Sequence, residues 1–90
     1  MFQYQAAQTG QVTVTAAATQ IVPAFPSRSG IVINNTGSTA CYIGENANVT
    51  AATGFFLPGT AGASVSFSST GAIYGITAGG SAVLSFLQTN

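Results

Sequence analysis

The stretch IVINNTGSTACYIG, residues 31–44, decides the fold class. Apolar Ile31 and Ile33 occupy every second position, and Cys41 and Ile43 do the same after the turn. A period of two is the spacing of a β-strand with one face toward the core. Because the intervening residues NNTGST favour turns, the stretch predicts two short strands that fold back on each other as a hairpin.

The same alternation recurs along the rest of the chain, and helix signals are nearly absent. It occurs in QVTVT (11–15), TQIVP (19–23), ASVSFS (63–68), GAIYGITA (71–78) and SAVLSFL (81–87). The dipeptide Gly79-Gly80 predicts a two-residue hairpin turn between the last two of these strands. We therefore expect an all-β protein, a single small antiparallel β-sandwich, jelly-roll-like or Ig-like, with about seven or eight short strands.

The length of 90 residues corresponds to one domain. Residues 1–10, MFQYQAAQTG, are rich in glutamine and uncharged, and they predict a flexible N-terminal arm. Residues 11–90 form the predicted sandwich. Phe2 and Tyr4 are the large apolar side chains of the arm, and we expect them to dock on a neighbouring molecule.

Charge is nearly missing from this chain: Arg28 is its one cation, Glu45 its one acid, and histidine is absent. General acid–base catalysis needs a pair of titratable groups, so we expect no enzyme. A zinc or iron site needs several Cys, His or carboxylate ligands, so we expect no metal and no cofactor. One arginine cannot supply the counterion release that drives nucleic-acid binding. No apolar run reaches the ~20 residues of a membrane span.

Arg28 and Glu45 invite interpretation as a pair. If the central hairpin turns near Gly37, the two residues lie at its open end. We expect a structural cross-strand ion pair there, worth less than ~1 kcal/mol at the surface. We favour this interpretation over a binding role for either side chain.

Large aromatic residues in predicted loops are candidates for contact with a partner. Phe25 lies between two prolines, and Phe55 and Phe56 precede Pro58. Loops usually run over the surface, where bulky apolar side chains need cover. For Phe25 and Phe56, capping of the sandwich core is an equally good interpretation.

The last predicted strand is apolar on both faces. Val83 and Leu87 point to one side, while Leu84 and Phe86 point to the other. Since a sandwich strand usually keeps one face toward water, loops or another subunit must cover the second face. We favour a subunit, with Leu84 and Phe86 as interface residues. A surface with almost no charge also lacks the repulsion that keeps small monomers apart.

The order of these segments resembles that of small β-sandwich virion structural proteins of tailed bacteriophages, of the head decoration, cement or head-fibre type. The resemblance lies in residues 19–44, 49–59 and 71–88. It implies a protein that is assembled in the host cytoplasm, commonly as a homotrimer, and located on the capsid surface of the virion. Its partner would be the major capsid protein, and it would stabilise the outer shell through apolar, uncharged surfaces.

A second interpretation is a carbohydrate- or receptor-binding β-sandwich module of a phage fibre or tail, because a fold does not fix a function. Tyr42, Tyr74, Asn46 and Asn48 could form a shallow site with aromatic and amide groups. The tyrosines could equally pack against neighbouring strands, which is the interpretation we favour.

Overall fold

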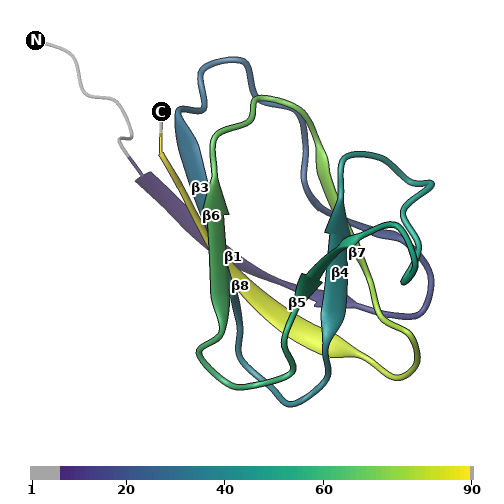
Figure 1. Ribbon diagram of the computed structural model, residues 1–90. Coiled ribbons are helices and arrows are strands. Elements are labelled where there is room, and N and C mark those ends of the chain that lie inside the picture. The colour runs from purple at the N-terminus through teal and green to yellow at the C-terminus, as the bar shows by residue number, and fades with distance from the viewer. Residues whose placement is uncertain (1–6, 90) are drawn as a thin grey trace, which may run out of the picture.

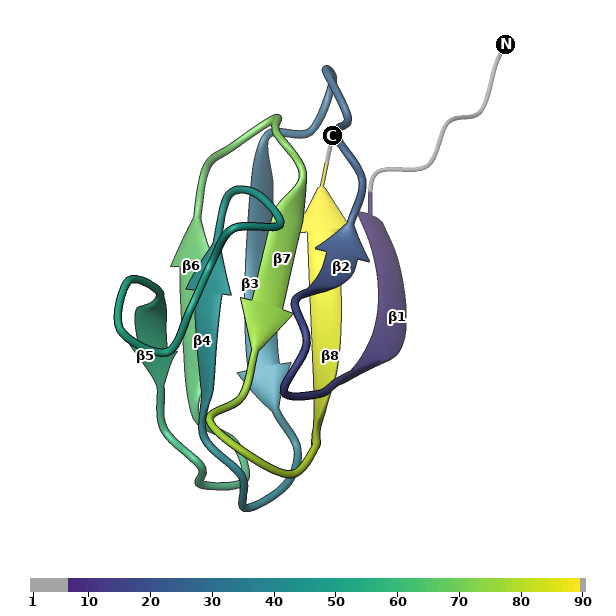
Figure 2. The same ribbon diagram turned by 90° about the vertical axis from the view of Figure 1, so that its right-hand side faces the viewer.

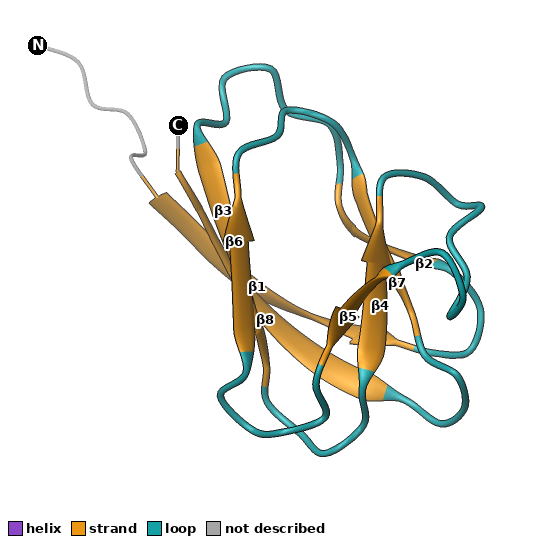
Figure 3. Cartoon of the chain, viewed as in Figure 1, coloured by secondary structure: helices purple, strands orange, loops and turns teal. Residues whose placement is uncertain are grey.

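The computed structural model describes residues 7–89, and within this range it contains eight strands and no helix (Figure 3). Sheet A consists, in spatial order, of β1 (Ala7–Val14), β8 (Ala82–Thr89), β3 (Gly30–Asn35) and β6 (Ser64–Phe67). Sheet B consists of β2 (Thr19–Val22), β7 (Ile73–Ile76), β4 (Cys41–Gly44) and β5 (Phe55–Leu57). The sheets face each other as two layers (Figure 1), which confirms the predicted β-sandwich. Since the described part of the chain has no helix, none is long and apolar enough to cross a membrane.

The chain passes from one sheet to the other at every connection except the one between β4 and β5. All strand pairs are antiparallel, and the spatial orders are β1-β8-β3-β6 and β2-β7-β4-β5. Eight strands in this interleaved order form a jelly roll, a double-sheet fold made of two Greek keys. The topology therefore selects the jelly-roll alternative over the Ig-like one.

The predicted hairpin over residues 31–44 is wrong. β3 pairs with β6 and β8, whereas β4 pairs with β5 and β7 in the opposite sheet. The Gly79-Gly80 segment likewise connects the two sheets and makes no hairpin. Alternation tells which face of a strand is buried, and that part was correct, but it does not name the pairing partner.

The boundary of the predicted arm also changes. Residues 7–10 belong to β1 and pair with the end of β8, with Ala7 opposite Thr89. Gly10 lies opposite Phe86, and a Cβ atom at Gly10 would stand 2.7 Å from the Phe86 ring. The ring thus covers the glycine, which fixes the register of this pair. Phe2 and Tyr4 lie outside the described residues.

The core lies between the sheets and contains side chains from both. Its buried members are Val14, Ile21, Val22, Ile31, Ile33, Cys41, Ile43, Leu57, Ile73, Ala82 and Leu84. Val12, Ala63, Val65, Phe67 and Phe86 pack against this cluster and are partly buried. Aliphatic side chains therefore dominate the interior, as expected for strands with one inward face.

One end of the sandwich is closed by the buried amide of Asn35. Its Nδ2 donates to the carbonyl oxygens of Thr39, at 2.8 Å, and Pro58, at 3.0 Å. Its Oδ1 accepts a hydrogen bond of 2.9 Å from the backbone N–H of Gly37. Asn35 thereby joins the β3–β4 connection to the β5–β6 connection, and both of these connections pass between the two sheets.

The other end is closed by Arg28, and the ion pair expected with Glu45 is not formed. Arg28 is only 3% exposed. Its Nε donates to the Ser69 carbonyl at 2.8 Å, and Nη1 donates to the Pro23 carbonyl and to Gln88 Oε1. Its Nη2 donates to the Gly71 carbonyl. Arg28 and Glu45 lie toward the same end of the sandwich, since Glu45 lines a cleft with Ser69, but Arg28 is buried and bonded to carbonyls while Glu45 is exposed. Arg28 is therefore a structural residue of the interior.

Replacement of Asn35 should measure how much its buried side-chain amide contributes to the free energy of unfolding. We expect Asn35→Ala to lower the free energy of unfolding by about 2–3 kcal/mol, because two partly buried carbonyls and one N–H lose their partner. Asn34→Ala, one residue earlier on the outward face, should change it by less than about 0.5 kcal/mol. Urea unfolding measures both. Equal effects of the two variants would contradict the role of Asn35.

The thiol of Cys41 should make stability depend on alkaline pH. Burial raises the pKa of the Cys41 thiol to about 11, so the folded state holds this proton more tightly than the unfolded chain. The stabilisation is therefore complete below the unfolded pKa of about 8.5 and is lost as pH rises through the folded value. Urea unfolding should show a loss of about 2–3 kcal/mol between pH 8.5 and 11. Cys41→Ala should lack this component, and an identical pH profile in the variant would refute it.

Candidate functional site

The described residues offer surfaces for binding but no cluster of catalytic or metal-ligating groups. Residues 7–89 contain no group of three or more His, Cys, Asp or Glu side chains that could hold a metal ion. The Cys41 thiol is buried, whereas Glu45 is exposed at the start of the β4–β5 loop. The candidate sites are therefore the exposed apolar and polar surfaces of the two sheets.

The outer face of sheet A carries an apolar patch, which we call the sheet A patch: Val32, Val83 and Leu87. All three side chains are exposed. Val32 on β3 stands directly opposite Leu87 on β8. Residues 30–32, 66–68, 87 and 89 line a shallow hollow of about 280 Å³ beside this pair. The surrounding strands contribute uncharged serine, threonine and glutamine side chains, so the face is nearly neutral.

Leu84 and Phe86, predicted as interface residues, belong to the core. Leu84 is fully buried, and Phe86 packs against the core cluster and over Gly10. The prediction chose the inward face, and the exposed apolar residues of β8 are Val83 and Leu87 instead. Since both faces of the strand are apolar, the sequence pattern alone could not separate Val83 and Leu87 from the inward pair.

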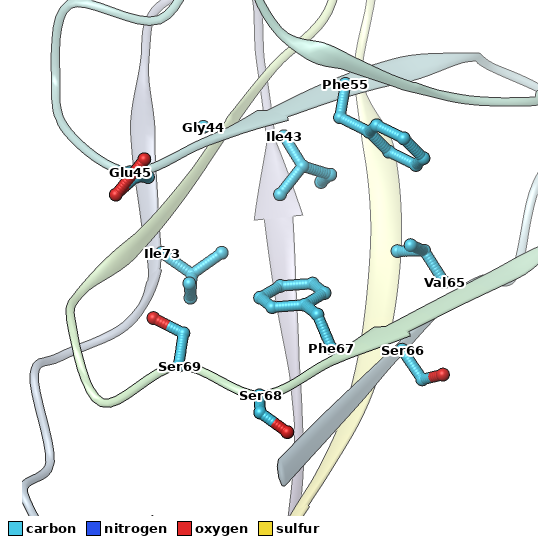
Figure 4. A pocket seen from close by; sticks show the side chains of 10 residues that line it. All are labelled: Ile43, Gly44, Glu45, Phe55, Val65, Ser66, Phe67, Ser68, Ser69 and Ile73. Carbon is cyan, nitrogen blue, oxygen red and sulfur yellow. The ribbon is translucent and has the colours of Figure 1, made fainter.

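A cleft opens between the two sheets along the edge strands β5 and β6. It has a volume of about 480 Å³. Figure 4 shows Ile43, Phe55 and Ile73 from sheet B pointing toward Val65 and Phe67 from sheet A. The cleft is thus mainly apolar. Both bordering strands are sheet edges with unpaired backbone groups, which natural proteins usually protect.

The aromatic residues predicted at the surface have different positions. Phe55 and Phe56 on β5 are 62% and 53% exposed. Phe55 lies opposite Ile43 at the mouth of the cleft, whereas Phe56 packs on the Tyr42 ring with 5.6 Å between ring centroids. Phe25 is half-buried, and its N–H donates to the Thr70 carbonyl. Among the predicted aromatics that the structure describes, Phe55 is therefore the most exposed.

The β4–β5 loop, residues 45–54, folds back over the outer face of sheet B (Figures 1 and 2). Val49 is buried there, and a Cβ atom at Gly44 would stand only 2.5 Å from the Val49 side chain. A Cβ atom at Gly54 would stand 2.6 Å from Tyr42 and 3.0 Å from Val49. The two glycines therefore create the space in which Val49 anchors the loop.

This loop builds a second hollow, also of about 480 Å³, next to the apolar cleft. Glu45, Asn46, Asn48 and Thr53 surround it, together with Ile43, Gly44, Val49 and Phe55. We call it the loop hollow. The asparagines predicted for a binding site therefore lie beside Glu45 and Phe55. Glu45 was expected to have a structural role, so its position here was missed.

Tyr42 and Tyr74 do not line the loop hollow. Tyr42 packs on Phe56 across the strand pair, which confirms the cross-strand packing we favoured for this tyrosine. Tyr74 lies opposite Gln20, whose Nε2 donates to the tyrosine hydroxyl at 3.4 Å. The combination of two tyrosines with two asparagines in one site is thus not formed.

Comparisons with known proteins find similarity in structure only. No protein-family model matches the chain, and no curated protein matches it. The stem and receptor binding domain of the spike protein P1 from bacteriophage PM2 is similar, with a TM-score of 0.58 and 18% identity over 89% of this chain. A chain in the structure of the entire lipid-containing bacteriophage PM2 gives a TM-score of 0.56 and 20% identity, also over 89% of this chain.

The likeness establishes the fold alone. This chain spans 32% and 25% of the length of the two PM2 chains. Both similar chains belong to bacteriophage PM2.

A methyl group at Gly44 should displace the β4–β5 loop. We expect Gly44→Ala to lower the free energy of unfolding by about 1–3 kcal/mol, because the new Cβ collides with Val49. Gly79→Ala is the matched control, since no atom lies within 4 Å of a Cβ at that position. Thermal unfolding and NMR shifts of residues 45–54 report on both. A Gly44→Ala protein with unchanged stability and loop shifts would contradict this packing.

Proposed function

We propose that this protein is a non-enzymatic structural component of a phage virion, a decoration or cement protein on the outer capsid surface. The resemblance of its sequence to such proteins and the fold it shares with PM2 virion chains support the proposal. The shortage of ionisable side chains supports it too, because a chain with one acid and no histidine has few means of catalysis.

The observation that carries the proposal is the sheet A patch on an uncharged β-sheet face. Val32 and Leu87 form a directly opposed apolar pair, and Val83 extends it along β8. Against the major capsid protein, such a face removes apolar area from water without desolvating any charge. An interface of standard size buries roughly 800 Å² per partner, so the patch would be its centre and the surrounding hydroxyls its rim.

Self-association into a homotrimer is part of the proposal. A nearly neutral surface lacks repulsion between copies, and the apolar cleft between β5 and β6 offers area to cover. Three linked copies would also allow each capsid contact to be weak, because avidity multiplies their effect. Such assembly would take place in the host cytoplasm, where capsid subunits are made.

The first test is the copy number of this chain in the purified particle that encodes it, by quantitative mass spectrometry. Hundreds of copies, in a simple ratio to the major capsid protein, are the expected result for decoration. A few copies to a few dozen would favour a fibre or spike part instead. Absence from the particle would refute a virion role.

Polar substitutions in the sheet A patch should weaken binding to the shell. We expect the double variant Val32→Ser, Leu87→Ser to bind undecorated capsids at least about tenfold more weakly, since central apolar anchors contribute most to an interface. The matched control is Ala51→Ser with Ala52→Ser in the exposed β4–β5 loop. Co-sedimentation with capsids measures binding, and urea unfolding verifies that both variants fold. Equal retention of the two proteins would exclude this face.

A second candidate function, a receptor-binding module of a fibre or spike, is favoured by one observation. The exposed ring of Phe55 borders a hollow rimmed by a carboxylate and two amides, which is more polar than a capsid contact requires. One of the similar structures includes a receptor binding domain.

A further inference from the structure

We infer that the loop hollow is a binding site for a neutral carbohydrate, with the Phe55 ring as its platform. The inference deepens the receptor-binding candidate by naming a site and a ligand class. It does not depend on the sheet A patch, because the loop hollow belongs to sheet B.

The hollow combines an apolar floor with a polar rim. Ile43, Val49 and Phe55 supply the apolar side, and Glu45, Asn46 and Asn48 supply hydrogen-bonding groups. Small-molecule sites typically have this composition, in which apolar surface gives contact and a few polar groups fix orientation. A purely apolar partner would bury the Glu45 carboxylate without a donor, which is costly.

Among the described residues, most hydrogen-bonding side-chain groups of Glu45, Asn46 and Asn48 have no partner in the protein. Asn46 Oδ1 accepts a bond of 2.8 Å from the Asn48 N–H, which fixes the amide and leaves its Nδ2 donors free. Within residues 7–89, the Glu45 carboxylate and the Asn48 side chain have no hydrogen-bond partner. A carboxylate accepts and amides both donate and accept, so together they match neighbouring hydroxyl groups on a sugar ring.

The Phe55 ring suits the other side of a sugar. The face of an aromatic ring carries partial negative charge, and the C–H groups on one face of a pyranose carry partial positive charge. Phe55 is 62% exposed and stands on an edge strand opposite Ile43, so its backbone position is fixed while its face stays open. A ligand with one apolar and one hydroxylated face would satisfy both parts of the hollow.

Charge limits the ligand to a neutral one. Glu45 is the acid of this surface, while Arg28, the one cation of the sequence, is buried and donates to the carbonyls of Pro23, Ser69 and Gly71. An anionic sugar or a nucleic acid would meet the Glu45 carboxylate without a compensating cation. Neutral hexoses meet no such repulsion.

The loop is also held in place before any ligand binds. Val49 is anchored on Gly44, and the Thr50 and Thr53 hydroxyls bond to each other at 3.1 Å. The Gly54 N–H donates to the Thr50 carbonyl at 2.8 Å. A preorganised loop loses little conformational entropy on binding, which favours recognition by a small number of contacts.

The test is an NMR titration of the full chain with glucose, galactose, mannose and N-acetylglucosamine, each to about 50 mM, since single-sugar sites often bind in the millimolar range. Glucuronate serves as the charged counterpart. We expect at least one neutral hexose to shift the amide signals of residues 45–55, and glucuronate to bind at least about threefold more weakly.

Variants separate the site from general surface effects. Phe55→Ser and Asn48→Ala should each weaken the best hexose at least about tenfold, and Glu45→Gln about threefold or more. Phe56→Ser is the matched control, because Phe56 lies on the same strand but packs on Tyr42 outside the hollow. It should leave hexose affinity unchanged. Urea unfolding of each variant confirms that the fold persists.

The outcomes are decisive. Hexose shifts that survive Phe55→Ser, or that occur away from the loop, would overturn the site, and equal binding of glucuronate would overturn the charge argument. If none of the four hexoses shifts the spectrum, the carbohydrate inference is wrong. A high copy number in the particle would still support decoration in that case, so the two proposals fail separately.

Discussion

The guanidinium of Arg28 is the interaction on which the arrangement of the sandwich ends depends. It lies beneath three segments and donates to Pro23, Ser69, Gly71 and Gln88, which belong to the β2–β3 connection, the β6–β7 connection and β8. Burial lowers the pKa of the Arg28 guanidinium by desolvation, yet the group stays charged because its ordinary value is so high. A buried charge is tolerated only when its donors are satisfied, and here carbonyl dipoles satisfy them in place of an acid.

Because the protein buries its one cation, Arg28, its surface is nearly free of charge. With Arg28 buried, the described surface has Glu45 as its charged side chain and otherwise consists of hydroxyls, amides and apolar groups. Its two candidate regions differ in kind. The sheet A patch is flat and apolar, as suits contact with another protein, whereas the loop hollow pairs an aromatic ring with unoccupied hydrogen-bonding groups.

Local alternation predicted the class of the fold but not its connections. Ile31, Ile33, Cys41 and Ile43 are all buried, as their spacing indicated, although they face the core from opposite sheets. Three features escaped the sequence for physical reasons. The inward face of β8 was missed because both faces are apolar, and the burial of Arg28 was missed because an isolated arginine is usually exposed. The packing of Val49 on Gly44 was missed because no periodic pattern records this contact. The exposure of Phe55 could be predicted because a bulky aromatic residue near a turn stands out in the sequence without knowledge of the strand pairing.

The geometry of the jelly roll lets the two binding candidates coexist. The sheet A patch is on the outward side of one layer. The β4–β5 loop lies beyond the outward side of the other layer (Figure 1). A copy docked on a shell through Val32 and Leu87 would therefore turn Glu45, Asn48 and Phe55 away from that shell. Because the two faces belong to separate sheets joined by a rigid core, occupation of one need not disturb the other. If both proposals hold, a small protein with two charged side chains would attach to a particle and still present a site to its surroundings.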